Sequence, residues 1–93
     1  MAALSNPTVI ASWGSAGGPR GAILGFQKVT AADTFDASTL TTIPAFNTVT
    51  SALFTDTSNR TATTTLSTMA GTVITILGTG IAADSGWLYI VGE

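Results

Sequence analysis

Short runs of apolar and β-branched residues alternate with segments rich in glycine and small polar residues along the whole chain. Runs of this kind, repeated about every ten residues, are typical of a small sandwich or barrel. The runs that we predict to be strands are residues 8–13, 22–30, 47–55, 60–69, 71–77 and 87–91. The pattern therefore predicts a single all-β domain over residues 1–93, a small antiparallel β-sandwich or barrel of about six or seven strands.

Glycine, proline, aspartate and asparagine mark the connections between these runs. We predict a long hairpin loop over residues 14–21, a turn over residues 56–59 and a loop over residues 78–86. Residues 33–40 contain a possible helix cap, but their apolar positions do not keep a helical spacing. We interpret this segment as a short strand or turn, and we expect the next strand to begin only after Pro44.

The last predicted strand is apolar on both of its faces. Trp87, Tyr89 and Val91 point to one side, while Leu88 and Ile90 point to the other. A half-exposed antiparallel strand would instead alternate apolar with polar residues. Two explanations stay open: the strand is central to the fold, or its second face meets another chain.

Charged residues make up only 9% of the chain, against about 25% in an average soluble domain, whereas 45% of the residues are apolar. A chain of 93 residues buries a modest core, so part of this apolar surface is expected to need a protein partner. We expect no membrane span, because the longest apolar stretch, 71–83, is short and interrupted by threonine and glycine. The first residues do not resemble a secretory signal.

The chain carries little of the chemistry that catalysis or ligand binding usually needs. It has no histidine and no cysteine, so we predict neither an enzyme nor a cofactor or metal site. The closest acidic pair, Asp33 and Asp36, is expected to cap loop amides rather than to act as an acid–base pair. Three scattered basic residues, Arg20, Lys28 and Arg60, are too few to favour nucleic-acid binding.

The aromatic side chains leave open the alternative of a sugar-binding surface. Trp13, Trp87 and Tyr89 could stack on sugars, and the last two share one strand face. A place in the core is favoured over such a binding platform.

Several segments resemble small β-rich virion proteins of tailed bacteriophages. They are 33–36 (Asp-Thr-Phe-Asp), a threonine-rich middle, 71–76 (Gly-Thr-Val-Ile-Thr-Ile) and the closing 86–92 (Gly-Trp-Leu-Tyr-Ile-Val-Gly). The resemblance extends over about residues 29–93 and implies a non-enzymatic virion structural protein. The role that the resemblance favours is that of a capsid decoration (cement) protein, which stabilises the phage head. Such a protein is assembled in the host cytoplasm into the virion. It is expected to form a homo-oligomer, in particular a trimer, on the major capsid protein or another virion protein.

Two alternatives to the decoration role remain: a tail, head–tail joining or fibre-knob subunit, and, from another class, a carbohydrate- or receptor-binding module. For self-assembly we predict the strand residues Trp87, Tyr89 and Val91. For attachment to the partner we predict an N-terminal arm (residues 1–8) and the loop near residue 20. The attachment residues are Leu4, Ser5, Asn6, Pro7, Thr8, Pro19 and Arg20.

Overall fold

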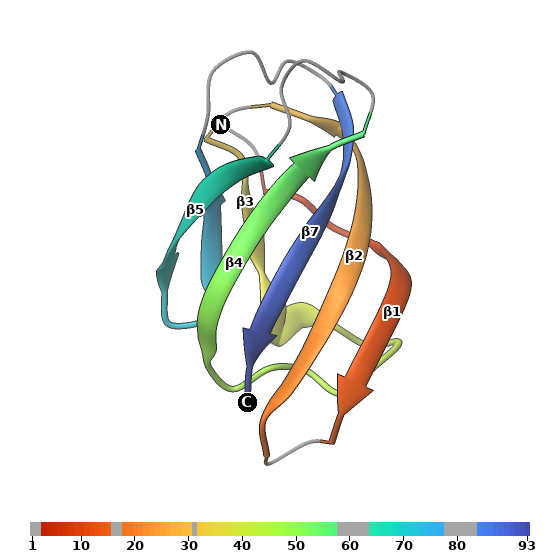
Figure 1. The fold of residues 1–93 in the computed structure, drawn as a ribbon, viewed down its shortest axis with the longest axis vertical. Helices are drawn as coiled ribbons and strands as arrows, with labels where there is room; N and C mark the ends of the chain where they lie inside the picture. Colours follow the sequence, from red (N-terminus) through yellow and green to blue (C-terminus); the bar gives the residue numbers. More distant parts are fainter. Residues whose placement is uncertain (1–2, 16–17, 31, 58–63, 78–83) are drawn as a thin grey trace.

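Seven strands and one short 3-10 turn make up the regular structure of the computed structural model, which describes residues 3–15, 18–30, 32–57, 64–77 and 84–93 (Figure 1). In chain order they are β1 (Thr8–Gly14), β2 (Arg20–Val29), β3 (Thr34–Asp36), the turn η1 (Ala37–Thr39), β4 (Val49–Asp56), β5 (Thr64–Ala70), β6 (Val73–Ile76) and β7 (Asp84–Gly92). The predicted all-β class and the strand count are confirmed.

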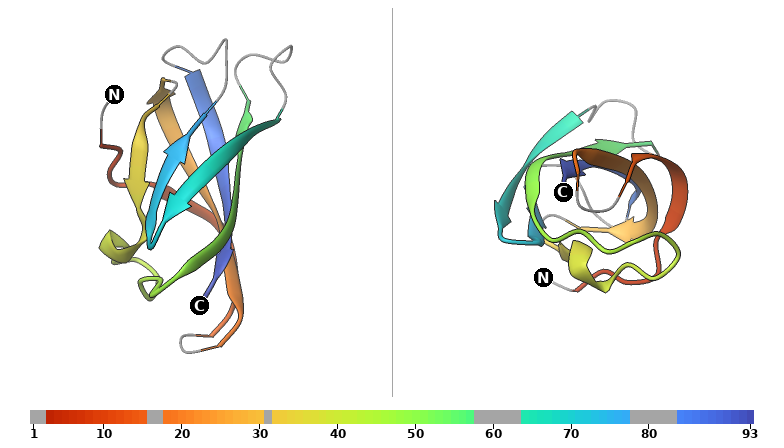
Figure 2. Two further views of the ribbon diagram at one scale, coloured as in Figure 1. Left: turned by 90° about the vertical axis from the view of Figure 1, so that its left-hand side faces the viewer. Right: turned by 90° about the horizontal axis from the view of Figure 1, so that it is seen from below.

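The strands form two antiparallel sheets, one of four strands and one of three, in a sandwich-like arrangement that does not close into a barrel (Figure 2). The larger sheet has the order β1-β2-β7-β4, and the smaller sheet has the order β5-β6-β3. Strand β5 connects them, because its first residues pair with β4 (Leu53↔Leu66) and its later residues pair with β6 (Met69↔Ile74). Strand β7 therefore lies in the interior of the larger sheet, between β2 and β4.

The core fills the space between the inner faces of the two sheets. Its largest fully buried side chains are Phe35, Phe46, Phe54, Leu24, Ile74, Ile76, Leu88, Ile90 and Val29. The rings of Phe26 on β2 and Phe35 on β3 meet edge to face with their centroids 5.1 Å apart, so the two sheets contact each other directly. Burial of these apolar side chains is the main source of stability in a chain without disulfides.

Sequence-based boundaries differ from the structure by one to three residues at most strand ends, and residues 58–63, which belong to the predicted turn 56–59 and strand 60–69, lie outside the described part of the chain. Strand β2 begins at Arg20, two residues before the predicted start, so the β1–β2 connection is shorter than predicted. Strand β7 begins at Asp84, within the predicted loop 78–86, whose residues 78–83 lie outside the described part of the chain. Residues 33–40 contain both a strand and a turn, because the carboxylate of Asp36 accepts a hydrogen bond from the amide of Ser38 and starts η1 at the end of β3.

Among the described residues, no helix is long and apolar enough to cross a membrane.

Close packing between β7 and β4 requires glycine at position 86. A Cβ atom there would overlap the ring of Phe54 and lie 2.7 Å from the carbonyl oxygen of Thr55. We expect Gly86→Ala to lower the free energy of unfolding by about 1–3 kcal/mol, because the buried ring must leave its position. Urea denaturation measures the change. Gly18→Ala is the matched control, since no atom of the described residues lies closer than 3.9 Å to a Cβ there. Equal losses in both variants would contradict this packing.

Candidate functional site

The outer face of the larger sheet carries a continuous group of large apolar side chains. Ile23 on β2, Tyr89 on β7 and Leu53 on β4 are cross-strand partners and form one row across the sheet. Trp13 on β1 pairs with Gly21, in the next row, and its ring reaches back to Tyr89, with the two ring centroids 5.5 Å apart. We call this surface the aromatic face and define it by Ile10, Trp13, Ile23, Leu53, Trp87, Tyr89 and Val91.

Side chains of the aromatic face are open to solvent although they are apolar. The exposed fractions are 41% for Trp13, 45% for Trp87 and 40% for Tyr89, whereas Leu88 and Ile90 on the opposite side of β7 are fully buried. No residue that defines the face is charged. Monomeric proteins rarely expose contiguous apolar patches of this kind unless the patch binds something.

The three residues predicted for self-assembly all lie on this face. Trp87 and Tyr89 are exposed and Val91 is half-buried. Strand β7 is central in its sheet, as the first of the two explanations predicted. Its outer side is not covered by the described part of the chain, and contact of that side with another chain stays a prediction. Sequence analysis missed Ile23 and Leu53, because only the strand register shows that they flank Tyr89.

The residues predicted for attachment lie in two separate places, at opposite ends of the β1–β2 hairpin. At one end, the backbone amide of Leu4 donates to the carbonyl of Thr34 at 2.7 Å, and the side chain of Leu4 packs against the core. Ser5, Asn6 and Thr8 are exposed and Pro7 is half-buried. At the other end, Pro19 is exposed. The N-terminal segment is thus docked on its own domain, along the outer edge of β3.

Arg20 is engaged within its own chain. It is 5% exposed, its guanidinium carbon lies 4.0 Å from the centre of the Phe46 ring, and Nη1 donates to the carbonyl of Ala45 at 3.1 Å. These contacts tie the start of β2 to the segment before β4 through a cation–π contact and a hydrogen bond. The guanidinium therefore stabilises the fold at this end of the sheet, where its donor and its charge already have partners.

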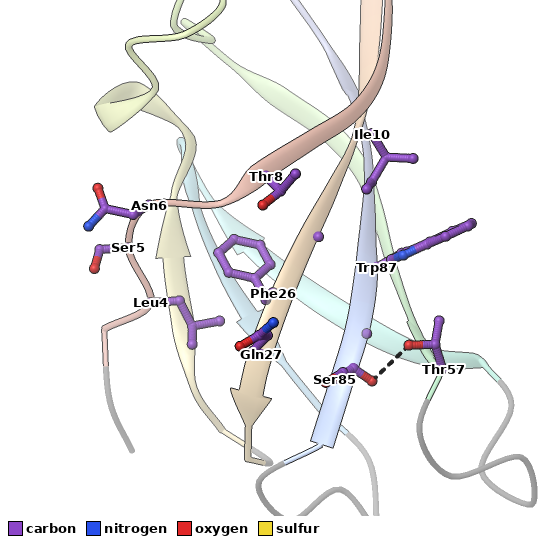
Figure 3. Close-up of a pocket in the computed structure, with 12 residues that line it drawn as sticks. Leu4, Ser5, Asn6, Thr8, Ile10, Phe26, Gln27, Thr57, Ser85 and Trp87 are labelled. Atoms are coloured by element: carbon purple, nitrogen blue, oxygen red, sulfur yellow. Dashed lines mark hydrogen bonds between the residues drawn. The ribbon is translucent and has the colours of Figure 1, made fainter.

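A groove of about 570 Å³ opens where the N-terminal segment leaves the larger sheet (Figure 3). It runs between that segment and the first residues of β7, with β2 as its floor. Uncharged polar side chains line it, and Trp87 borders it on the far side, where its indole extends away from the N-terminal segment. Three of these polar residues, Ser5, Asn6 and Thr8, were predicted for attachment. Sequence analysis missed the other three, Gln27, Thr57 and Ser85, because they come from distant parts of the chain.

Asp33 and Asp36 bind local donors, as expected from the sequence. Oδ2 of Asp33 accepts from the amide of Thr30 at 2.9 Å. Oδ1 of Asp36 accepts from the amide of Ser38 at 3.0 Å and from the hydroxyls of Ser38 and Thr72 at 2.7 Å each. The predicted capping role is confirmed for both carboxylates. Among the described residues, no group of three or more acidic side chains is placed to hold a metal ion.

Comparisons with protein-family models, curated proteins and solved structures find no match to this chain. What is established is a small all-β protein with two antiparallel sheets and an exposed, uncharged aromatic face.

The capping of η1 predicts an acid-sensitive contribution to stability. Hydrogen bonds from the Ser38 hydroxyl, the Thr72 hydroxyl and the Ser38 amide hold the pKa of Asp36 below its ordinary value of 3.8. Because the folded pKa is lower, this contribution is present above pH 3.8 and is lost as the pH falls through the folded value. We expect Asp36→Asn to lower the melting temperature at about pH 6, and the difference from wild type to shrink below pH 3.8.

Thermal unfolding followed by circular dichroism between about pH 6 and pH 2.5 measures this difference. The difference between the melting temperatures of wild type and Asp36→Asn is taken at each pH. The effect of the other carboxylates cancels in this difference, because both proteins contain them. A difference that stays constant over the whole range would show that the Asp36 carboxylate does not stabilise the fold through its charge.

Proposed function

We propose that the protein is a non-enzymatic assembly subunit that buries its aromatic face against other copies of itself. The observation that carries this proposal is the exposure of Trp13, Trp87 and Tyr89 side by side on an uncharged sheet face. Aromatic side chains supply a large contact area with few rotatable bonds, and they dominate the energetics of many interfaces. In a trimer the aromatic faces of the three copies meet around the symmetry axis, so no charge is buried there without a partner.

The low charge of the chain supports the same role. The net charge is −2, so two copies repel each other only weakly. The surface has few charged groups to keep a monomer dispersed. Burial of the aromatic face in an oligomer removes the apolar surface that this composition leaves exposed.

The resemblance to small phage virion proteins suggests the biological form of this assembly. In that form the protein is a capsid decoration (cement) protein, a trimer bound to the major capsid protein in the virion. The aromatic face holds the copies together, and exposed residues at the two ends of the β1–β2 hairpin contact the shell; they are Ser5, Asn6, Thr8 and Pro19. A tail, head–tail joining or fibre-knob subunit is the alternative, and a closed ring of more than three copies would favour it.

The mass of the purified protein in solution tests self-assembly. We expect light scattering at micromolar concentration to give the mass of an oligomer, in particular a trimer. Tyr89→Asp is expected to convert it to monomer, because the substitution places a charge at the centre of the aromatic face. Leu77→Asp is the matched control. Leu77 is 41% exposed and directly follows β6, a strand of the smaller sheet, so its replacement should leave the mass of the oligomer unchanged.

A wild-type monomer at all concentrations would overturn self-assembly as the use of this face. An oligomer that survives Tyr89→Asp would show that the copies meet elsewhere. Binding of the trimer to empty phage shells, lost when Asn6 and Thr8 are replaced, is the corresponding test of the decoration role.

A further inference from the structure

The groove under the N-terminal segment exists because the pairing of β1 with β2 ends before β2 itself ends. Their pairing ends at Thr8↔Gly25, after which the chain toward the N-terminus crosses to the smaller sheet and bridges Ala3 to Thr34. Asn6 makes the bend possible with a φ of 54°, a left-handed conformation that asparagine tolerates better than most residues. The hollow below this crossing is thus a consequence of the backbone path rather than of loosely packed side chains.

The floor of the groove presents the polar side chain of Gln27. It is exposed on the same face of β2 as Ile23 and Gly25, as regular alternation along the strand requires, and its amide lies in the groove (Figure 3). A bulge follows, which interrupts the register with β7 between Phe26 and Val29 and in which Lys28 has a φ of 57°. Gly25, directly opposite Trp87 in the sheet, adds no side chain that would cover the indole.

Hydrogen-bonding groups in the groove are numerous and neutral. Of the 12 residues that line it, six have hydroxyl or amide side chains, and none is charged. The hydroxyl of Thr57 donates to the carbonyl of Ser85 at 3.2 Å, which fixes its orientation at one wall. Such groups donate and accept equally well, so they suit a ligand with many hydroxyls. An anionic ligand would find no compensating positive charge among the lining residues.

Trp87 provides an apolar surface beside the polar groups of the groove. Its indole is 45% exposed at the edge of the groove. A sugar ring has an apolar C–H face that packs on an aromatic ring and a rim of hydroxyl groups that hydrogen-bond. The volume of about 570 Å³ lies within the usual range for ligand sites, about 300–1,000 Å³.

We propose that this groove binds an uncharged oligosaccharide, with one ring packed on the indole of Trp87 and its hydroxyls bonded to Gln27 and the neighbouring polar side chains. An extended peptide fits less well. It would have to add to the free edge of β2, where the bulge interrupts the regular series of donors and acceptors that an added strand needs.

Fluorescence of Trp87 tests the proposal directly. The chain has two tryptophans, so Trp13→Phe leaves Trp87 as the only one. This variant is titrated with maltohexaose, cellohexaose, chitotetraose and a neutral galactan fragment. We expect a saturable change in emission with at least one of them. Gln27→Ala should weaken that binding about tenfold or more, because it removes a hydrogen-bonding amide from the site.

Asn47→Ala is the matched control, since Asn47 is also an exposed primary amide but does not line the groove. It should leave the affinity unchanged. Both amide variants should keep the melting temperature and oligomeric mass of the parent protein, so failure of sugar binding is distinguishable from failure of self-assembly.

No response of Trp87 to any of the four sugars would overturn the proposal. So would equal affinity of the Gln27→Ala variant and its parent, because the ligand would then lie elsewhere. A response to an uncharged hexapeptide but to no sugar would assign the groove to a peptide instead.

Discussion

Strand β7 imposes the constraint on which the rest of this structure depends. It carries large apolar side chains on both sides, but the described part of the chain covers only one of them. Leu88 and Ile90 are packed between the sheets, while Trp87 and Tyr89 remain open to solvent. The smaller sheet, with β6 and the short β3, can cover only one face of the larger sheet. No further layer of the described residues covers the other face, and its burial against another molecule is what we propose.

The N-terminal segment links this constraint to the second candidate site. By crossing from β1 to the edge of β3, it pairs Ala3 with Thr34 and occupies an edge that would otherwise be free to aggregate. The same path leaves the edge of β2 that faces β1 without a described partner beyond Gly25, while β7 still pairs with the other edge, and it opens the groove beside Trp87. One backbone route therefore protects one strand edge and exposes another.

Local patterns in the sequence predicted where the strands lie. They did not predict which residues of different strands meet in the aromatic face and in the groove. Alternation of Leu88 and Ile90 with their aromatic neighbours predicted both the strand and its two apolar faces, because side-chain direction in a strand follows a period of two. The partners of Tyr89 depend on register, which is set by contacts between segments distant in sequence. Arg20 shows the same limit: nothing around it in the sequence indicates the Phe46 ring, 26 residues later, on which its guanidinium lies. The bulge between Phe26 and Val29 likewise has no local signal.

The two proposed surfaces meet at Trp87, and this imposes a thermodynamic relation between them. Tyr89 and Val91 lie toward the end of β7 that pairs with the start of β2, whereas Trp87 lies toward the groove. An interface centred on Tyr89 leaves the indole accessible, and sugar binding is then independent of assembly. An interface that extends over Trp87 makes the two events exclusive, and linkage requires each to weaken the other by the same factor. Sugar affinity measured against protein concentration therefore reports where the edge of the interface lies.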